Sequence, residues 1–515
     1  MTTDSPNRLR QLLSIMRGND DLAFAKYLEE CLAQGTTLYI PEEVSLQLKT
    51  GFYPIDRVLR IEGGGTIRGN GKSNLFELKN NADIQFKNVS FKNFACVLKA
   101  GKRDISYQLD IDGIQLENCQ SLVFAGLNNK EVKKVGPISI KNSVFKNCIG
   151  PVIEIRNLHL NQVEISKNRF FNTQKLKHKS AVIEVGGGTN FSRATNVKVQ
   201  FNTIDNFNFV DKACGIIVHG ASEVVISDNQ ISNLCSTHIS DKDSHGIYIK
   251  ASNTKILRNT LIDAGEGEAA IINKGLAKNH AYTTPGTPSG DNVLIEGNKI
   301  SYTNEYHLRA KKNITGITVT GTNQTVRNNT IKNVTNGIEL RSGQLVKGKN
   351  YTGGFTIVGN KIHQLQHCLS RKGKSAVQGI AIMQQTNNVM VKQNEIKFTP
   401  EITSIPTYVF GIACLTNGDT ENIVIEENTI ENKLTEQKDK SSYAINVRTK
   451  GIIKNLVLLN NVISGFSYGV VLNDNNNLAT YQNVKVDNQY KNIHRKKQQQ
   501  ITKHPQRHSI RFKKD

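Results

Sequence analysis

The 515-residue sequence predicts an all-β fold, a parallel β-helix, and three observations support this prediction. A short phrase that contains an asparagine recurs along the chain, a second phrase alternates with it, and apolar residues occupy every other position in both. Alternation with period two places one face of each short strand in a core. A repeat of this size buries that face only by stacking on its neighbours.

The first phrase reads apolar, x, apolar, x, x, Asn, x, apolar, as in "VEISKNRF" and "IVIEENTI". Its asparagines lie about 24 to 39 residues apart, a spacing typical of solenoids. They are Asn88, Asn118, Asn142, Asn168, Asn202, Asn229, Asn259, Asn298, Asn329, Asn360, Asn394, Asn428 and Asn461. Asparagine tolerates the left-handed backbone of a tight corner, and stacked amides can hydrogen-bond to one another. We therefore expect these residues to form the corners of the coils and a ladder along them.

The second phrase supplies another short strand to each coil, as in "HGIYIK", "TGITVT" and "NGIELR". Its alternate Val and Ile residues are expected to point inward and stack into one core. Together the two phrases predict a solenoid of about 12 to 13 coils over residues 36–490. A leucine-rich-repeat solenoid is the rival fold, but it would require Leu at the core positions and a helical segment in each unit.

The two ends of the chain differ from the repeats. Residues 1–35 show the apolar spacing of one or two helices, with Ser5 before Pro6 as a helix start, and we expect them to cap the open end of the solenoid. Residues 491–515 are dense in Lys, Arg, His and Gln and predict a flexible, solvated tail. The functional alternative for this tail is a contact with an anionic membrane surface or an acidic glycan. Nucleic acid is disfavoured, because the charges lack the interleaved stacking aromatics of a nucleic-acid groove, and Phe512 is the only Phe, Tyr or Trp in the segment.

Composition indicates the class of partner and the compartment. The chain has 66 basic and 44 acidic residues, a formal net charge of +22, which favours an acidic partner. The eight cysteines form no CxxC pair and are typical of reduced, buried thiols. The N-terminus lacks the apolar run of a signal peptide, and no stretch reaches the roughly 20 apolar residues of a membrane span. We expect a protein that is cytoplasmic as synthesised, with release by lysis or in a virion left open.

Residues near the N-terminus also carry a family resemblance. A predicted amphipathic helix is followed by "GTTLYIPEE" and then by "LRIEGGGTIRGNG", an order that resembles the entry of the pectate-lyase superfamily. The general pattern extends over roughly residues 20–475. The resemblance implies a right-handed β-helix and an activity on an acidic polysaccharide, cleaved by a lyase or a hydrolase. The alternative is a non-catalytic glycan-binding or structural protein, such as a phage spike or a surface component.

Aligning the second-phrase strands, with no bulge assumed, predicts two columns of outward residues. The end column, which follows the last core position of each strand, contains His219, Lys250 and Lys274 on consecutive coils, and Arg341 further along. Neighbouring strands lie about 4.8 Å apart, and like charges that close repel one another. A column of cations therefore predicts an anionic ligand, and we expect His219, Lys274 and Arg341 to bind substrate. The middle column contains Glu154, Glu184, Tyr248, Thr318 and Glu339.

The stretch "SDKDSHGIYIK" gathers the candidate catalytic residues Asp241, Asp243, His245, Tyr248 and Lys250. Acids in the loop before the next strand, Glu266 and Glu268, are expected to take part in substrate binding, and Asp263 is a further candidate for a carboxylate pair. No metal-binding residues are assigned, and the oligomeric state is left open. The alternative is a plain solvated sheet in which His245 only shapes a turn.

Two reactions fit these residues. In β-elimination, cations or a bound Ca²⁺ neutralise the substrate carboxylate, and a Lys, His or Tyr removes the neighbouring proton. Hydrolysis instead requires a pair of carboxylates beside the glycosidic bond. The "SHG" at 244–246 is similar to the His-Gly element of polygalacturonases, but the Asn-Thr-Asp and Arg-Ile-Lys elements of that family are absent.

Overall fold

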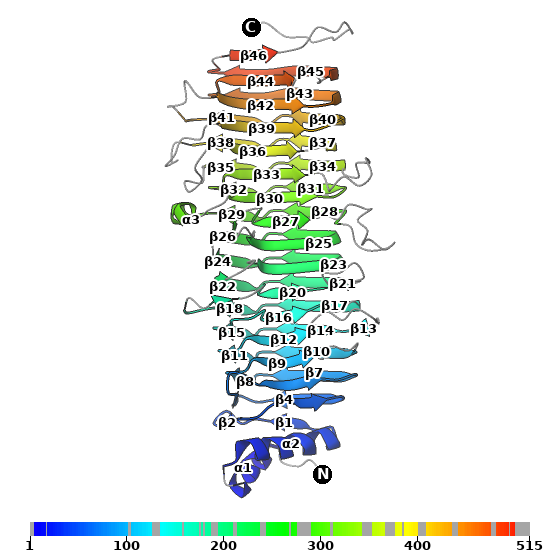
Figure 1. Cartoon of the computed structure of the whole chain (residues 1–515), viewed down its shortest axis with the longest axis vertical. Coiled ribbons are helices and arrows are strands. Elements are labelled where there is room, and N and C mark those ends of the chain that lie inside the picture. Colours follow the sequence, from blue (N-terminus) through cyan, green and yellow to red (C-terminus); the bar gives the residue numbers. More distant parts are fainter. Residues whose placement is uncertain are drawn as a thin grey trace. The chain divides into compact units, whose positions relative to one another are not determined.

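The computed structural model confirms the predicted fold class, a right-handed parallel β-helix with short N-terminal helices (Figure 1). It falls into two compact units, which we call unit 1 (up to Ser236) and unit 2 (from Ser244). The structure describes residues 5–16, 18–100, 105–125, 134–156, 159–174, 177–178, 181–186, 194–209, 214–236, 244–266, 269–274, 290–309, 313–341, 353–365, 376–383, 386–399, 408–434, 441–474, 480–493 and 495–499.

In unit 1 each coil passes through three parallel sheets. The front sheet, which faces the viewer in Figure 1, contains β3 (Tyr53–Ile55), β6 (Asn74–Leu78), β9 (Cys96–Ala100), β12 (Ser121–Ala125), β16 (Ile153–Ile155), β20 (Ile183–Val185) and the first part of β23 (Cys214–Ser227). The second sheet contains β1 (Thr37–Tyr39), β4 (Val58–Glu62), β7 (Ala82–Lys87), β10 (Tyr107–Asp112), β14 (Ile138–Lys141), β17 (His159–Ser166), β21 (Ala194–Gln200) and the rest of β23, with β13 (Lys134–Val135) beside β17. The third sheet contains β2 (Ser45–Gln47), β5 (Thr66–Arg68), β8 (Ser90–Lys92), β11 (Gln115–Glu117), β15 (Val144–Lys146), β18 (Arg169–Phe171), β22 (Thr203–Phe209) and β24 (Gln230–Ser236), with β19 (Lys177–His178) beside β22.

Unit 2 repeats this arrangement. Its front sheet contains the first part of β25 (Ser244–Leu257), β27 (Ile271–Lys274), β30 (Thr315–Thr320), β33 (Asn336–Arg341), β36 (Ala376–Met383), β39 (Tyr408–Thr416), β42 (Ser441–Thr449), β44 (Tyr468–Asp474) and β46 (Arg495–Gln499). The second sheet contains the rest of β25, β28 (Val293–Glu296), β31 (Gln324–Arg327), β34 (Gly353–Val358), β37 (Asn387–Lys392), β40 (Thr420–Glu426), β43 (Ile452–Ser464) and β45 (Thr480–Lys491). The third sheet contains β26 (Thr260–Glu266), β29 (Lys299–Ser301), β32 (Thr330–Lys332), β35 (Lys361–His363), β38 (Glu395–Phe398), β41 (Thr429–Asn432) and the end of β43, and the short helix α3 (Asn304–Arg309) follows β29.

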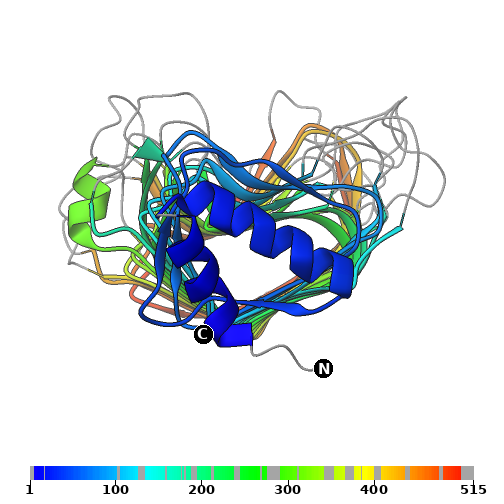
Figure 2. The ribbon, with the colours of Figure 1, turned by 90° about the horizontal axis from the view of Figure 1, so that it is seen from below.

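Two N-terminal helices, α1 (Ser5–Ile15) and α2 (Asp20–Gln34), lie across the first strands of unit 1 (Figure 2). Asn19 caps α2 by accepting a hydrogen bond from Leu22 N, and α2 ends at Gly35, which adopts a left-handed backbone. Phe24 of α2 packs against the rings of Tyr53 and Phe76 in the front sheet. The helices therefore cover the apolar end of the first coils.

The strands near the C-terminus extend beyond residue 490. β46 pairs with β44 in the front sheet, so its backbone lies within the segment predicted to be a tail. Its side chains and residues 500–515 lie outside the described residues, and a contact of this segment with an anionic membrane stays a prediction. Among the described residues, no helix is long and apolar enough to span a membrane, and the six cysteines with described side chains are buried without disulfides.

The corners of the coils differ from the prediction in one respect. A left-handed backbone and a ladder were both expected of the same asparagines, and the structure divides these roles between adjacent residues. From Asn168 to Asn461 the residue before each ladder asparagine has the positive φ: Lys167, Phe201, Asp228, Arg258, Gly297, Asn328, Gly359, Gln393, Glu427 and Asn460. The side chain of Phe201 is exposed, whereas the ladder requires an inward side chain, so one residue does not serve both roles.

Three of the predicted asparagines consequently occupy other positions. Asn88 and Asn142 are themselves left-handed and precede the ladder position, which Ser143 occupies in the second case. Asn118 is also left-handed but lies in a different corner, after β11. The prediction that these three residues belong to the ladder was therefore wrong.

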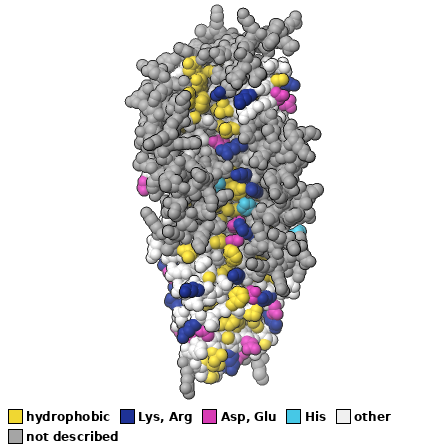
Figure 3. Space-filling view, viewed as in Figure 1, with side chains coloured by type: hydrophobic (Ala, Val, Ile, Leu, Met, Phe, Trp, Pro, Cys, Tyr) yellow, Lys and Arg dark blue, Asp and Glu magenta, His cyan; other side chains and the backbone are white. Residues whose placement is uncertain are grey.

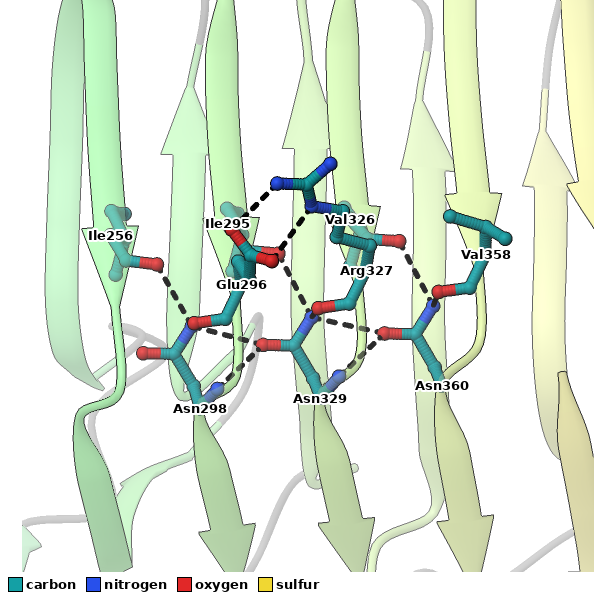
Figure 4. Close-up of polar contacts among 9 residues, drawn as sticks. All are labelled: Ile256, Ile295, Glu296, Asn298, Val326, Arg327, Asn329, Val358 and Asn360. Atoms are coloured by element: carbon teal, nitrogen blue, oxygen red, sulfur yellow. Dashed lines mark hydrogen bonds and ion pairs between the residues drawn. The ribbon is translucent and has the colours of Figure 1, made fainter.

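The ladder itself is continuous within unit 2 from Asn259 to Asn488 and buried as far as Asn461. Each side-chain oxygen accepts two hydrogen bonds from the preceding asparagine, one from its backbone N–H and one from its amide (Figure 4). From Asn298 to Asn461 each amide also donates to a backbone carbonyl, as Asn329 does to Ile295 at 2.9 Å. The ladder thus satisfies backbone groups that the corner removes from the sheets.

Candidate functional site

The strand pairings confirm the predicted columns within each unit. In unit 2, Tyr248 pairs with Ile272, Ile272 with Thr318, and Thr318 with Glu339, which is the predicted middle column. Lys250 and Lys274 each follow the pair Ile249–Asn273 by one residue, so they occupy the same position on neighbouring strands. In unit 1, Glu154 pairs with Glu184, and Glu184 with Ile217.

A recurrent bulge determines which side chains join these columns. The backbone N–H groups of Gly246 and Ile247 both donate to the carbonyl of Ala270 at 2.9 Å, so two consecutive residues face the core. A methyl group on Gly246 would approach Leu261 Cδ2 to 2.4 Å, which confirms its inward direction. The bulge resets the alternation and places His245 on the outer face with Tyr248 and Lys250. It lies before both columns and therefore leaves their register unchanged.

His245, Tyr248 and Lys250 form a contiguous cluster on β25. The ring centroids of His245 and Tyr248 lie 5.3 Å apart, and Lys250 Nζ lies 5.8 Å from the centroid of the Tyr248 ring. His245 is only 4% exposed, and its Nδ1 lies 2.8 Å from the carbonyl oxygen of Ala269. The structure therefore brings together three of the five predicted catalytic residues, with His245 buried behind Tyr248.

Lys274 and Arg341 have different surroundings in the end column. Lys274 is exposed, and its strand β27 lies beside β25. Arg341 is half-buried, and its Nη2 lies 2.6 Å from Glu339 Oε2. Asn336 donates to the other oxygen of Glu339 at 2.8 Å, so this carboxylate is held by two side chains. The Arg341–Glu339 pair is neutral overall, and two lysines, Lys250 and Lys274, occupy this column on β25 and β27.

The middle column faces outward but is shielded from solvent. In the described part of unit 2, Ile272, Thr318, Ala381 and Ala413 are exposed by 1% or less. Basic, acidic and apolar side chains are seen along the strands of the front sheet in the space-filling view (Figure 3). A ligand on this face would consequently meet the end column, where Lys274 is exposed, before the middle column.

His219 lies on the front sheet of unit 1. A methyl group on Gly186 would meet the backbone oxygen of His219, so His219 follows Gly186 in the end column of unit 1. Arg156, Gly186 and His219 thus occupy successive coils. The predicted alignment of His219 with both lysines stays a prediction.

The predicted acids are only partly within the described residues. Asp241, Asp243 and Glu268 lie outside them, as does the side chain of Glu266, whose backbone pairs with Ser244 at the start of β25. Asp263 is buried, and its two oxygens accept hydrogen bonds from Thr303 N at 2.7 Å and Thr303 Oγ1 at 2.8 Å. Asp263 therefore has a structural role, because it fixes the backbone at Thr303, just before α3.

Among the described residues, no set of carboxylates at this cluster corresponds to a calcium site, and the predicted loop acids lie outside those residues. Calcium takes six to eight oxygen ligands, and the described part of the chain contains no group of three or more His, Cys, Asp or Glu side chains that could hold a metal. The nearest described carboxylate in the end-column region, Glu339, is held by Arg341 and Asn336.

The prediction from sequence did not include one cluster on the front sheet of unit 1. Glu154 and Glu184 pair directly on β16 and β20, and Arg156 Nε lies 3.5 Å from Glu154 Oε1 and 2.7 Å from Glu184 Oε1. The signal was present in the sequence as "IEI" and "IEV", two glutamates at equivalent positions of successive strands. Alignment placed both glutamates in the middle column. Whether such a glutamate is charged depends on its exposure, which the sequence does not show.

Comparison with known proteins gives similarity in fold alone. No family model and no curated protein matches the chain. The surface adhesin PfbA of Streptococcus pneumoniae is similar over 70% of this chain and 90% of its own, at 15% identity and a TM-score of 0.44. The catalytic unit of a GH87 α-1,3-glucanase from Streptomyces thermodiastaticus is similar over 80% of this chain and 62% of its own, at 11% identity and a TM-score of 0.37. The Dettilon tailspike protein is similar over 90% of this chain and 64% of its own, at 10% identity and a TM-score of 0.26.

Proposed function

We propose that this chain binds an acidic polysaccharide on the front sheet of unit 2 and cleaves it beside Tyr248. The observation that carries the proposal is the position of Lys250 and Lys274, which are aligned on the neighbouring strands β25 and β27. Two ammonium groups at this spacing repel each other. A substrate carboxylate bound by Lys274 relieves that repulsion and gains a charge-assisted contact.

The cluster supports β-elimination better than hydrolysis in unit 2. Lys274 binds the carboxylate of the uronate residue, which acidifies the adjacent C–H. The Lys250 amine in its neutral form takes this proton, the electron pair forms a carbon–carbon double bond, and the glycosidic oxygen leaves with a proton from the Tyr248 hydroxyl. His245 packs against the Tyr248 ring and positions it. Hydrolysis would require a carboxylate pair, and the one carboxylate described beside this face, Glu339, is bound to Arg341.

The shielded middle column favours a second candidate, binding without cleavage. Thr318 and Ile272 are almost fully buried, which limits how closely a sugar ring can approach the centre of the sheet. A glycan held by the exposed Lys274 alone would then be bound and released unchanged. The two candidates share the same ligand and differ only in turnover.

A screen of acidic polysaccharides distinguishes these candidates. Incubation with polyuronates and sulfated glycans should produce new absorbance from unsaturated uronate together with new reducing ends, and neutral glucans should give neither. Reducing ends without the absorbance would identify a hydrolase and contradict the elimination step. Salt-sensitive binding without either product would establish the binding protein, and no binding to any acidic glycan would refute the proposal.

A further inference from the structure

Two buried glutamates and one arginine form a charge cluster on the front sheet of unit 1, apart from the residues of the proposed function. Glu154 on β16 is 5% exposed, and Glu184 on β20, its direct partner in the adjacent coil, is 2% exposed. Arg156 donates a 2.7 Å hydrogen bond to Glu184, whereas Glu154 lies 3.5 Å from the same nitrogen. One guanidinium thus faces two carboxylates and binds one of them closely.

The neighbouring strands do not supply a second cation at the position of the pair. Phe124 of β12 pairs with Glu154 on one side, and Ile217 of β23 pairs with Glu184 on the other. The nearest described Lys and His side chains on this sheet are farther away. Lys99 lies on β9, two strands from Glu154, and pairs with Phe124, and His219 lies two residues after Ile217 on β23. When both glutamates are ionised, the cluster carries a net negative charge between apolar neighbours, an unfavourable arrangement at low exposure.

We propose that Glu154, Glu184 and Arg156 form a proton-operated clasp, which holds the coils of β16 and β20 together when Glu154 is neutral and loosens them when Glu154 is charged. With Glu154 protonated, Arg156 and Glu184 form a single neutral ion pair. Loss of the proton places two like charges at directly opposed positions of adjacent strands, where like charges destabilise the pairing.

The direction of the pH dependence follows from the acidity of Glu154. The pKa of Glu154 is raised to about 7, because burial and the neighbouring Glu184 raise it by more than Arg156 lowers it, and burial is the largest cause. The ordinary value for a glutamate is 4.5, so between pH 4.5 and 7 the folded coil holds a proton that the opened chain releases. Stability from this group is present below pH 4.5, falls as the pH rises through this window, and stays low above pH 7.

Hydrogen exchange read by mass spectrometry tests the clasp in the full-length chain. Protection factors, corrected for intrinsic exchange, should fall in peptides from β16 and β20 by up to about tenfold per pH unit between pH 5 and 7. Glu154→Gln should remove this dependence and give higher protection than the wild type at pH 8. Glu164→Gln provides the matched control, because Glu164 lies on β17 of the second sheet and should leave the wild-type profile unchanged.

Two further results decide the proposal independently of how well Glu154→Gln folds. In Glu184→Gln, Arg156 can pair with Glu154 and stabilise its charged form. Glu154 then loses its proton at lower pH, so the fall in protection should also occur at lower pH. A wild-type profile that is flat between pH 5 and 7 in β16 and β20 overturns the clasp. The clasp is also overturned if Glu154→Gln keeps the full wild-type dependence, because the titrating group would then be another residue.

Discussion

Replacing Asn360 with alanine should lower the free energy of unfolding of unit 2 by roughly 3 to 5 kcal/mol, since several buried polar groups lose their partners together. Asn360 Oδ1 accepts from both the backbone N–H and the amide of Asn329, at 3.0 Å each. Its own amide donates to Val326 O and Asn394 Oδ1, each at 2.9 Å. Alanine removes all four contacts inside a corner that excludes water.

A matched control separates the buried ladder from asparagine stacking in general. Asn422 belongs to a second, exposed row of asparagines, in which its amide donates to Asn388 Oδ1 at 2.8 Å. Its φ is +58°, so glycine is the suitable replacement. Chemical denaturation, with hydrogen exchange in β31, β34 and β37, should show a large loss for Asn360→Ala and a change below about 1 kcal/mol for Asn422→Gly. Equal losses would contradict the role given to burial.

Replacing Gly337 with alanine should destabilise unit 2 by about 3 kcal/mol. The bulge points this residue inward, toward a core that has no space for an added methyl group. Its added methyl group would lie 2.3 Å from the backbone oxygen of Gly379 and 2.6 Å from Ile362 Cγ2. A backbone atom of the next coil is unable to move aside without breaking the strand pairing. The loss should appear as a lower denaturation midpoint and reduced protection in β33 and β36.

The same position in another coil provides the control for Gly337→Ala. Ala444 is buried and occupies the equivalent place in β42, where it precedes Ile445. Ala444→Gly should cost about 1 kcal/mol, the ordinary backbone cost of glycine in a strand. If Gly337→Ala is as mild as Ala444→Gly, the core at β33 is looser than the contacts indicate and the bulge does not constrain this residue.

The fold and the register were predictable because they depend on local patterns. Alternating Val and Ile residues specify which face of each strand is buried, and a one-residue slip would expose that face. The corners were less predictable, since a positive φ falls on residues as different as Lys167 and Glu427. In the corner next to the ladder these residues share no common type, whereas most of the other left-handed residues that are not glycine are asparagines, as the sequence predicted.

The site was predictable only in part, because exposure depends on segments that are distant along the chain. Alignment placed Lys250 and Lys274 at equivalent positions of adjacent strands, and the observed register includes the residues directly before them, Ile249 and Asn273. Alignment also predicted that Thr318 faces outward, but it did not predict that Thr318 is shielded from solvent, as the structure shows. Glu154 was placed beside Glu184 without any indication that burial makes it hold a proton near neutral pH.

The lysine pair is the centre of the functional proposal, and its removal is the most direct test. Lys250→Ala and Lys274→Ala should each reduce turnover of the polyuronate found by the screen at least tenfold, and Lys274→Ala should also weaken binding. Folding should be retained, because removing one of two like charges relieves repulsion. Arg448→Ala is the matched control, since Arg448 is an exposed cation in the same column, several strands away.

The decisive measurement is the initial rate of polyuronate cleavage by the wild type, Lys250→Ala and Arg448→Ala at equal concentrations of folded protein. The proposal predicts that Arg448→Ala keeps the wild-type rate, whereas Lys250→Ala loses it while its unfolding midpoint is unchanged or higher. A Lys250→Ala variant that cleaves at the wild-type rate, or an Arg448→Ala variant that loses activity in its place, would contradict a site at β25 and β27.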